Sequence, residues 1–240
     1  MIAVLLLVFG CPDSPESIEP FIANIMGGRK PSPEQLQKIK ERYRMIGGHS
    51  PLLDITRRQA EALEKRLNSK IPLNPPLLKG EKSPPKGDFR VFVGIRHWHP
   101  FIKDTLKEIV SSGIKRIVTV IMSPHHSKFS TDGYIKALKE AKTELLSISP
   151  PYIRGSERGL NISFVSNWHT HPLFLEAVAD EINKGMSYFK DVDRKEVHVI
   201  FSAHSLPIYD DLYVKQLNET IEEIIKLTGS ISWHLGFQSK

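Results

Sequence analysis

Histidine side chains lie at several points where an apolar, strand-like stretch of the sequence ends. Seven of the ten histidines stand at such points: His97, His99, His125, His126, His169, His171 and His204. In a parallel sheet these strand ends meet at one edge, and imidazole is both a metal ligand and a proton acceptor near neutral pH. The pattern therefore indicates a cleft that binds a metal ion, an acid or both. For any one histidine taken alone, a surface or capping role is the more frequent alternative.

Two of these groups, His97/His99 and His169/His171, have a single residue between their members. On an extended segment this spacing places both rings on one face, which permits shared metal ligation. A proline follows each pair, so helix starts explain the pairs equally well. We therefore expect no structural zinc site. The sequence also lacks a glycine-rich phosphate loop and a serine nucleophile elbow.

The elements that would position these side chains alternate between strands and helices. Apolar runs predict strands at Ile2–Phe9, Arg90–Ile95, Arg116–Met122, Ile162–Ser166, Val197–Ala203 and Ile231–Phe237. Helical spacing of apolar residues predicts helices at Ser14–Met26, Pro33–Met45, Ile55–Leu67, Phe101–Ser111, Tyr134–Leu146, Pro172–Met186 and Leu212–Leu227. This alternation predicts an α/β fold with parallel sheets. Residues 68–88 are rich in Pro, Lys and Gly, and we interpret them as a solvated insertion.

Composition narrows the choice of partner and compartment. The formal net charge of +6 suits an anionic partner, namely nucleic acid, an acidic membrane surface or a small polycarboxylate. Basic and acidic residues alternate without an arginine-rich tract, so we expect no nucleic-acid partner. The single cysteine, Cys11, excludes an internal disulfide and favours a reducing compartment. The apolar start, Met1–Phe9, is interpreted as a buried strand, because it lacks the features of a signal peptide and is too short to span a bilayer.

Taken in chain order, five stretches resemble the motifs of ferrochelatases, the class II chelatases of heme synthesis. They are Phe9–Glu16, Tyr43–Leu52, Val93–Pro100, Phe201–Pro207 and Phe237–Lys240. The Phe-Ser-Ala-His-Ser-Leu-Pro stretch matches the most diagnostic motif of that family, whereas Cys11 stands where the family usually has Thr. The same stretch also favours ferrochelatases over related chelatases that load cobalt or nickel.

The resemblance implies two Rossmann-like domains with a porphyrin cleft between them. We expect an N-terminal domain over residues 1–190 and an incomplete second domain over residues 191–240. The implied reaction inserts Fe(II) into protoporphyrin IX to form protoheme, with Fe(II) as a substrate and no organic cofactor. Some family members that use coproporphyrin carry Tyr where Phe9 stands, which favours protoporphyrin. We expect a cytoplasmic enzyme, either free or peripheral at the membrane.

The resemblance also assigns roles to individual residues. His204 is expected to accept pyrrole protons or to ligate the iron transiently, which makes it both the catalytic and the metal-binding candidate. Arg96 is expected to pair with the porphyrin propionates, since guanidinium pairs well with carboxylate. We expect His97, His126, Ser50 and Pro51 to line the pocket. Trp168 is either a macrocycle contact or a core residue.

Family members normally continue beyond the stretch that ends at Lys240, and the continuation carries an acidic residue that faces the motif histidine. Three explanations stay open. The chain is a truncated enzyme, one half of a split enzyme whose second piece is a separate chain, or a non-catalytic protein that binds porphyrin or metal. We favour the first, because an unfinished sheet lacks core and nothing in the sequence replaces the lost face.

Overall fold

The computed structural model describes residues 1–69, 88–148, 160–193, 196–206, 210–229 and 231–238. Most of the proline-rich stretch expected to be an insertion lies outside the described residues. Strands in chain order are β1 (Ile2–Val8), β2 (Phe89–Ile95), β3 (Arg116–Ile121), β4 (Asn161–Val165), β5 (His198–His204) and β6 (Ser232–Gln238). Helices are α1 (Ile18–Ile25), α2 (Pro33–Met45), α3 (Leu52–Asn68), α4 (Ile102–Ser111), α5 (Thr131–Ile148), α7 (Pro172–Met186) and α8 (Asp211–Thr228).

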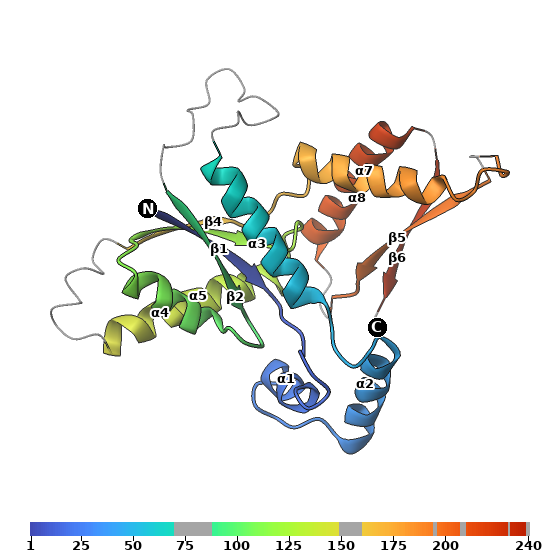
Figure 1. The fold of residues 1–240 in the computed structure, drawn as a ribbon. Coiled ribbons are helices and arrows are strands. Elements are labelled where there is room, and N and C mark those ends of the chain that lie inside the picture. The colour runs from blue at the N-terminus through green and yellow to red at the C-terminus, as the bar shows by residue number, and fades with distance from the viewer. Residues whose placement is uncertain (70–87, 149–159, 194–195, 207–209, 230, 239–240) are drawn as a thin grey trace. The chain divides into compact units, whose positions relative to one another are not determined.

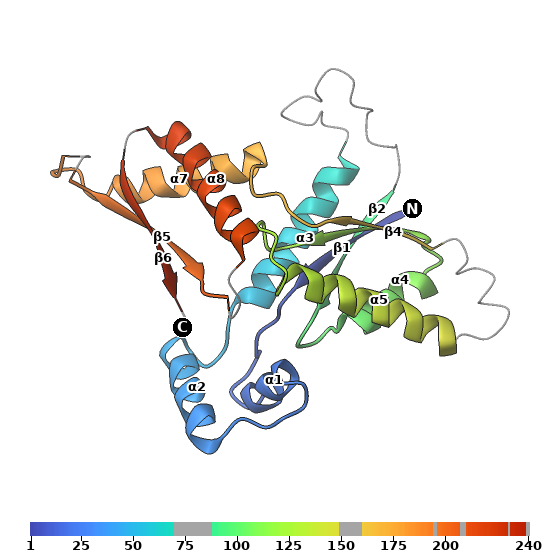
Figure 2. The ribbon, with the colours of Figure 1, turned by 180° about the vertical axis from the view of Figure 1, so that it is seen from behind.

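The described chain divides into two compact units. Unit 1 contains residues 1–122 and 134–165, and unit 2 contains residues 123–133 and 166–240. Unit 1 is built on a four-stranded parallel sheet with the strand order β2-β1-β3-β4, and unit 2 on the parallel pair β5-β6 (Figures 1 and 2). The α/β prediction with parallel sheets is therefore confirmed, and the second sheet is the smaller one.

Strand β1 is the centre of unit 1. All seven of its residues are buried, as expected of a strand that has neighbours on both sides and helices on both faces. Ala3, Leu5 and Leu7 point to one face, where they pack with α4 and α5. Val4 and Leu6 point to the other face, where they pack against α3. The continuous apolar run is thus two alternating sets of core residues, one for each layer of helices.

The carboxyl end of β1 depends on a glycine. Gly10 has a φ angle of +101°, and a Cβ atom there would lie 2.5 Å from Cγ2 of Ile95. Any other residue would be strained by the backbone angle and would collide with β2. Gly10 therefore lets the chain turn closely across the end of β2.

The outer edge of β2 is covered by side chains of α3. The backbone N–H of Val91 donates to Oε2 of Glu64 at 2.7 Å. Asn68 accepts from the N–H of Phe89 at 2.9 Å and donates to the carbonyl oxygen of Phe89 at 2.8 Å. An edge strand otherwise presents unpaired backbone N–H and C=O groups, which can pair with a strand of another chain. These side-chain hydrogen bonds satisfy several of those groups on β2.

Unit 2 packs α7 against α8, and the β5-β6 pair runs beside them, as both ribbon views show (Figures 1 and 2). Helix α8 buries Gln216, Leu217, Thr220, Ile221, Ile224 and Thr228. The division of the chain differs from the boundary expected at residue 190, because α7 belongs with α8 and not with the first sheet. Among the described residues, no helix combines the length and the apolar character needed to cross a bilayer.

Candidate active site

The carboxyl ends of β1 and β2 form the first cluster of predicted site residues, in unit 1. The N–H of Arg96 donates to the carbonyl oxygen of Val8 at 2.9 Å, and that of His97 donates to the carbonyl oxygen of Phe9 at 3.1 Å. These two bonds continue the parallel pairing past the end of the strands. They fix the Arg96–His97 segment beside the turn that follows β1.

The His97 ring packs on Phe9, with ring centroids 4.6 Å apart. The backbone carbonyl oxygen of His97 also accepts a hydrogen bond from the side-chain amide of Asn24 at 3.2 Å. Burial, assisted by the positive charge of Arg96, lowers the pKa of His97 to about 4. The imidazole is therefore neutral near pH 7, next to an aromatic ring that is 40% exposed.

The Arg96 guanidinium lies elsewhere in the same unit. It sits over the Tyr134 ring, 5.7 Å from the ring centroid, in a cation–π arrangement. Burial raises the pKa of Tyr134, so that ring stays neutral at physiological pH. Arg96 also lines a hollow of about 180 Å³ together with Glu140 and Glu144 of α5. The guanidinium thus has aromatic and acidic neighbours of its own.

The loop before α3 brings Ser50 and Pro51 to the turn after β1. The N–H of Ser50 donates to the carbonyl oxygen of Pro12 at 3.4 Å, and the Cys11 thiol donates to the carbonyl oxygen of Ser50 at 4.0 Å. The Ser50 hydroxyl accepts from the N–H of Leu52 at 3.3 Å, at the start of α3. Ser50, Pro51 and His97 are therefore all attached to the same turn.

Two further cations lie near this loop, and the sequence analysis did not single them out. Lys40 and Arg44 of α2 line a hollow of about 400 Å³ with Pro15, Glu16, Ile18 and Gly48. The two cations are four residues apart on α2, so they share one face of the helix. That spacing is the signal from which the sequence could have identified them as a possible pair for carboxylates.

The second cluster of histidines lies in unit 2, where loops contact α8. Nε2 of His125 lies 2.9 Å from the Thr220 hydroxyl, and that hydroxyl donates to backbone carbonyl oxygens. The hydroxyl has a single hydrogen, so which of the two groups donates in the first bond depends on the His125 tautomer. Burial and the nearby His169 lower the pKa of His125 to about 4.

His169 and His126 are also fixed by contacts within unit 2. Nε2 of His169 lies 2.9 Å from a carboxylate oxygen of Glu219, and this bond lowers the Glu219 pKa. The backbone N–H of His126 donates to the Gln216 side-chain oxygen at 2.6 Å. Nε2 of the His126 ring lies 3.8 Å from a carboxylate oxygen of Asp132. Nδ1 of both histidines is buried and has no hydrogen-bond partner among the described residues. His125 and His169 are therefore structural partners of α8.

His204 is the last residue of β5 and its side chain is exposed. It lies opposite Gln238 of β6, and the next N–H, that of Ser205, donates to the Gln238 carbonyl oxygen at 2.8 Å. The motif around His204 is thus held by strand pairing, and its imidazole is left open to a ligand.

The predicted site residues thus divide between the units. Ser50, Pro51, Arg96 and His97 belong to unit 1, and His126 and His204 belong to unit 2. No cluster of three or more His, Cys, Asp or Glu side chains suited to a metal ion occurs among the described residues.

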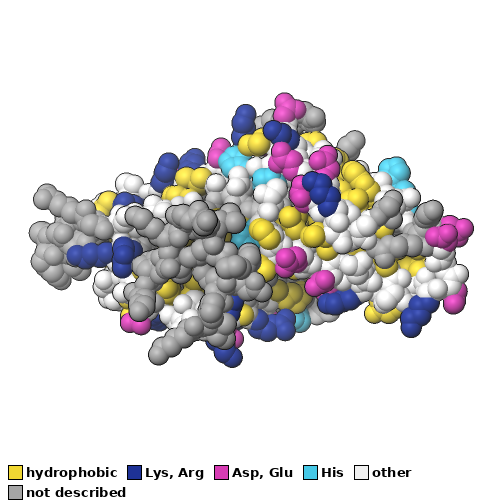
Figure 3. Space-filling view, turned by 90° about the horizontal axis from the view of Figure 1, so that it is seen from above, with side chains coloured by type: hydrophobic (Ala, Val, Ile, Leu, Met, Phe, Trp, Pro, Cys, Tyr) yellow, Lys and Arg dark blue, Asp and Glu magenta, His cyan; other side chains and the backbone are white. Residues whose placement is uncertain are grey.

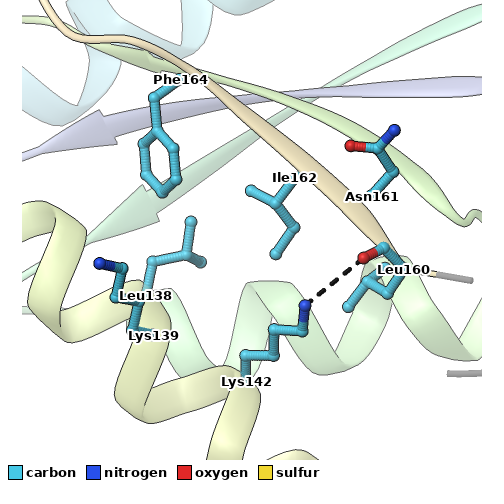
Figure 4. Close-up of a pocket in the computed structure, with 7 residues that line it drawn as sticks. All are labelled: Leu138, Lys139, Lys142, Leu160, Asn161, Ile162 and Phe164. Atoms are coloured by element: carbon cyan, nitrogen blue, oxygen red, sulfur yellow. Dashed lines mark hydrogen bonds between the residues drawn. The ribbon is translucent and has the colours of Figure 1, made fainter. Parts of the chain in front are cut away.

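A further hollow of unit 1, like the one beside Gly48, contains none of the predicted site residues. It has a volume of about 470 Å³ and lies between α5 and β4, with Leu138, Ile162 and Phe164 as its apolar wall (Figure 4). The Lys142 ammonium group donates there to the carbonyl oxygen of Leu160 at 3.4 Å. Among the described side chains on the face shown in Figure 3, basic and acidic groups are interspersed.

Comparisons with known proteins agree with the motifs. The model of the ferrochelatase family matches residues 1–240. The chain is 35% identical to the coproporphyrin III ferrochelatase of Oceanobacillus iheyensis, over 100% of this chain and 70% of the relative. It is 34% identical to coproporphyrin III ferrochelatase 1 of Bacillus anthracis, over 99% of this chain and 70% of the relative. It is 29% identical to a ferrochelatase of Herpetosiphon aurantiacus, over 99% of this chain and 71% of the relative.

Proposed function

The chain belongs to the ferrochelatase family, whose members are metal chelatases, and on that premise we propose that it inserts Fe(II) into a porphyrin. The observation that carries the proposal is the exposed imidazole of His204 at the end of β5, within the family's most diagnostic motif. Fe(II) and the free-base porphyrin are the substrates in this proposal, and no organic cofactor takes part.

The proposed reaction requires a base. A free-base porphyrin carries two N–H protons, and both must leave as the metal enters the ring. Neutral imidazole is well suited to accept protons near neutral pH. We assign this role to His204, with transient iron ligation at the same ring.

In unit 1, we propose an aromatic contact surface for the porphyrin. The Phe9 and His97 rings offer a partly exposed apolar surface, and Ser50 and Pro51 are attached to the same turn. His97 is neutral there, which avoids placing a buried charge against a flat apolar ring. In unit 2, His126 is a further proposed porphyrin contact.

The identity of the porphyrin is a finer proposal. Phe9 favours protoporphyrin IX, whereas two of the relatives described above are named coproporphyrin III ferrochelatases. We propose coproporphyrin III, because those similarities cover nearly the whole chain and the Phe9 argument rests on one residue.

The test is an anaerobic assay that follows the porphyrin absorption bands after Fe(II) is added to the purified chain. We expect metalation, with a larger kcat/KM for coproporphyrin III than for protoporphyrin IX. His204→Ala should lower kcat at least about 100-fold, the usual scale for loss of a general base. His198→Ala is the matched control, since His198 lies on the same face of the same strand and is also exposed.

The outcomes of this assay separate the proposals. Metalation that survives His204→Ala would remove His204 from the mechanism. A preference for protoporphyrin IX would overturn only the choice of substrate. Porphyrin binding without metalation would contradict the proposed activity and support a binding protein.

The same assay tests which cation holds the propionates. Arg96→Leu should raise KM with little change in kcat if Arg96 pairs with a propionate, because a binding contact far from the pyrrole nitrogens is lost. Arg44→Leu should do the same if the α2 cations serve instead. Arg42→Leu on α2 is the control, because Arg42 does not line the hollow beside Gly48. An unchanged KM in Arg96→Leu would exclude Arg96 from the site.

A further inference from the structure

A pair of histidines lies on the outer face of the β5-β6 sheet, apart from the proposed catalytic group. His198 begins β5 and His234 lies within β6. Nε2 of His198 and Nδ1 of His234 are in hydrogen-bond contact, and the two ring centroids are 4.6 Å apart with an interplanar angle of 38°. Both rings are exposed.

Strand pairing explains why these rings meet. His234 is paired with Ile200, the residue two positions after His198 on β5, so the two histidines are diagonal neighbours on one face. Ile200 is 72% exposed on that face. Phe201 and Trp233 alternate to the opposite face, where their ring centroids are 6.0 Å apart. The ladder and this aromatic pair therefore hold the two imidazoles together on the open side of the sheet.

Two imidazoles in contact form a ready pair of nitrogen ligands. In the metal-free pair one nitrogen carries the shared hydrogen, and the other presents its lone pair. For both contact nitrogens to bind a metal, the shared hydrogen must move to the other nitrogen of the ring that carries it. Each contact nitrogen then has a free lone pair, and a small rotation of the exposed rings turns both lone pairs toward one ion. Zn(II) or Cu(II) would then bind at about 2.0–2.1 Å from each nitrogen, the usual metal–imidazole distance.

We propose that His198 and His234 form a binding site for a late first-row divalent cation such as Cu(II) or Zn(II). Imidazole nitrogen prefers these ions, and Cu(II) binds most tightly in the series. Among the described residues no third His, Cys, Asp or Glu completes the site, so water fills the remaining positions. The site is therefore open and reversible, unlike a closed structural zinc site.

This site is distinct from the proposed catalytic histidine. His204 lies on the same strand but six residues further on, about 20 Å away at the rise of an extended strand. One ion cannot bridge the two positions. The proposal therefore depends only on the pairing of β5 with β6, and it stands whether or not the chain metalates a porphyrin.

The test is a titration of the full chain with Cu(II). Calorimetry measures the stoichiometry and affinity, and electron paramagnetic resonance detects the nitrogen ligands. We expect one equivalent bound with nitrogen coupling from two imidazoles, and Zn(II) should bind the same site more weakly than Cu(II). His198→Gln and His234→Gln should each weaken that equivalent at least about tenfold, or about 1.4 kcal/mol. One remaining imidazole cannot chelate the ion, so each single variant already lacks the two-nitrogen site. The double variant should therefore bind this equivalent of Cu(II) no more weakly than either single variant.

The control is His171→Gln, which removes an exposed histidine of the same unit and should leave the titration unchanged. Circular dichroism of each variant checks that the sheet is intact. Retention of the two-nitrogen signal in both single variants would overturn the proposal. Additive losses in the double variant would also overturn it, because they would indicate two independent histidines.

Discussion

Burial decides the protonation state of two histidines in this chain. The pKa of His97 and that of His125 are both lowered to about 4, mainly because burial disfavours the charged ring. One of these rings packs on an aromatic side chain and the other is hydrogen-bonded to a threonine hydroxyl. Their positions after strands could be predicted from the sequence, but their partners could not, because Phe9 and Thr220 are distant in the chain.

The lowered pKa of His125 predicts an acid-sensitive stability. The unfolded ring takes up a proton near its ordinary pKa of 6.5, whereas the folded ring resists until about pH 4. Stability is therefore fully present above pH 6.5 and is lost as the pH falls toward 4. The expected loss is on the order of 1 kcal/mol, since the ring is partly exposed to solvent screening.

Chemical denaturation at a series of pH values measures this effect. His125→Gln should flatten the pH dependence of the unfolding free energy between pH 6.5 and 4. The exposed His171→Gln serves as the control for removal of an imidazole. A slope in His125→Gln equal to that of the parent chain would contradict the argument.

The start of α8 shows how an element is fixed by a residue just outside it. The Asp210 carboxylate accepts from the N–H of Tyr213 at 3.3 Å as an N-cap, and from the N–H of Lys128 at 2.8 Å. Backbone hydrogen bonding, above all from Lys128, lowers the Asp210 pKa. One side chain thus begins the helix and fastens the loop that carries His125 and His126.

Asp210→Ala should therefore destabilise unit 2 by about 1–3 kcal/mol, since both the helix cap and the charge-assisted bond from the Lys128 N–H are lost. Thermal unfolding measured by circular dichroism reports the change. Asp211→Ala is the matched control, because Asp211 is exposed in the first turn and should cost only a few tenths of a kcal/mol. Equal effects of the two substitutions would mean that neither the cap nor the contact with Lys128 contributes to stability.

At the scale of the whole molecule, local patterns predicted the elements well. The strand expected at Arg116–Met122 is β3 (Arg116–Ile121), and the helix expected at Pro33–Met45 is α2 with those bounds. The α/β architecture followed from the alternation of such segments. Periodicity does not show which sheet a helix joins. The sequence therefore predicts α7 in the first domain, although it packs against α8. For the same reason the contacts of His126 with α8 could not be foreseen.

The placement of β1 in the middle of its sheet has a consequence for how the chain is made. Its seven apolar residues are synthesised before both partner strands, since β2 begins some 80 residues later in the chain and β3 later still. At synthesis rates of about 5–20 residues per second, the strand waits roughly 4–16 s for its first partner. During that interval the most apolar segment of unit 1 has no sheet to join. Nascent chains of this protein are thus natural clients for a chaperone that shields short hydrophobic stretches.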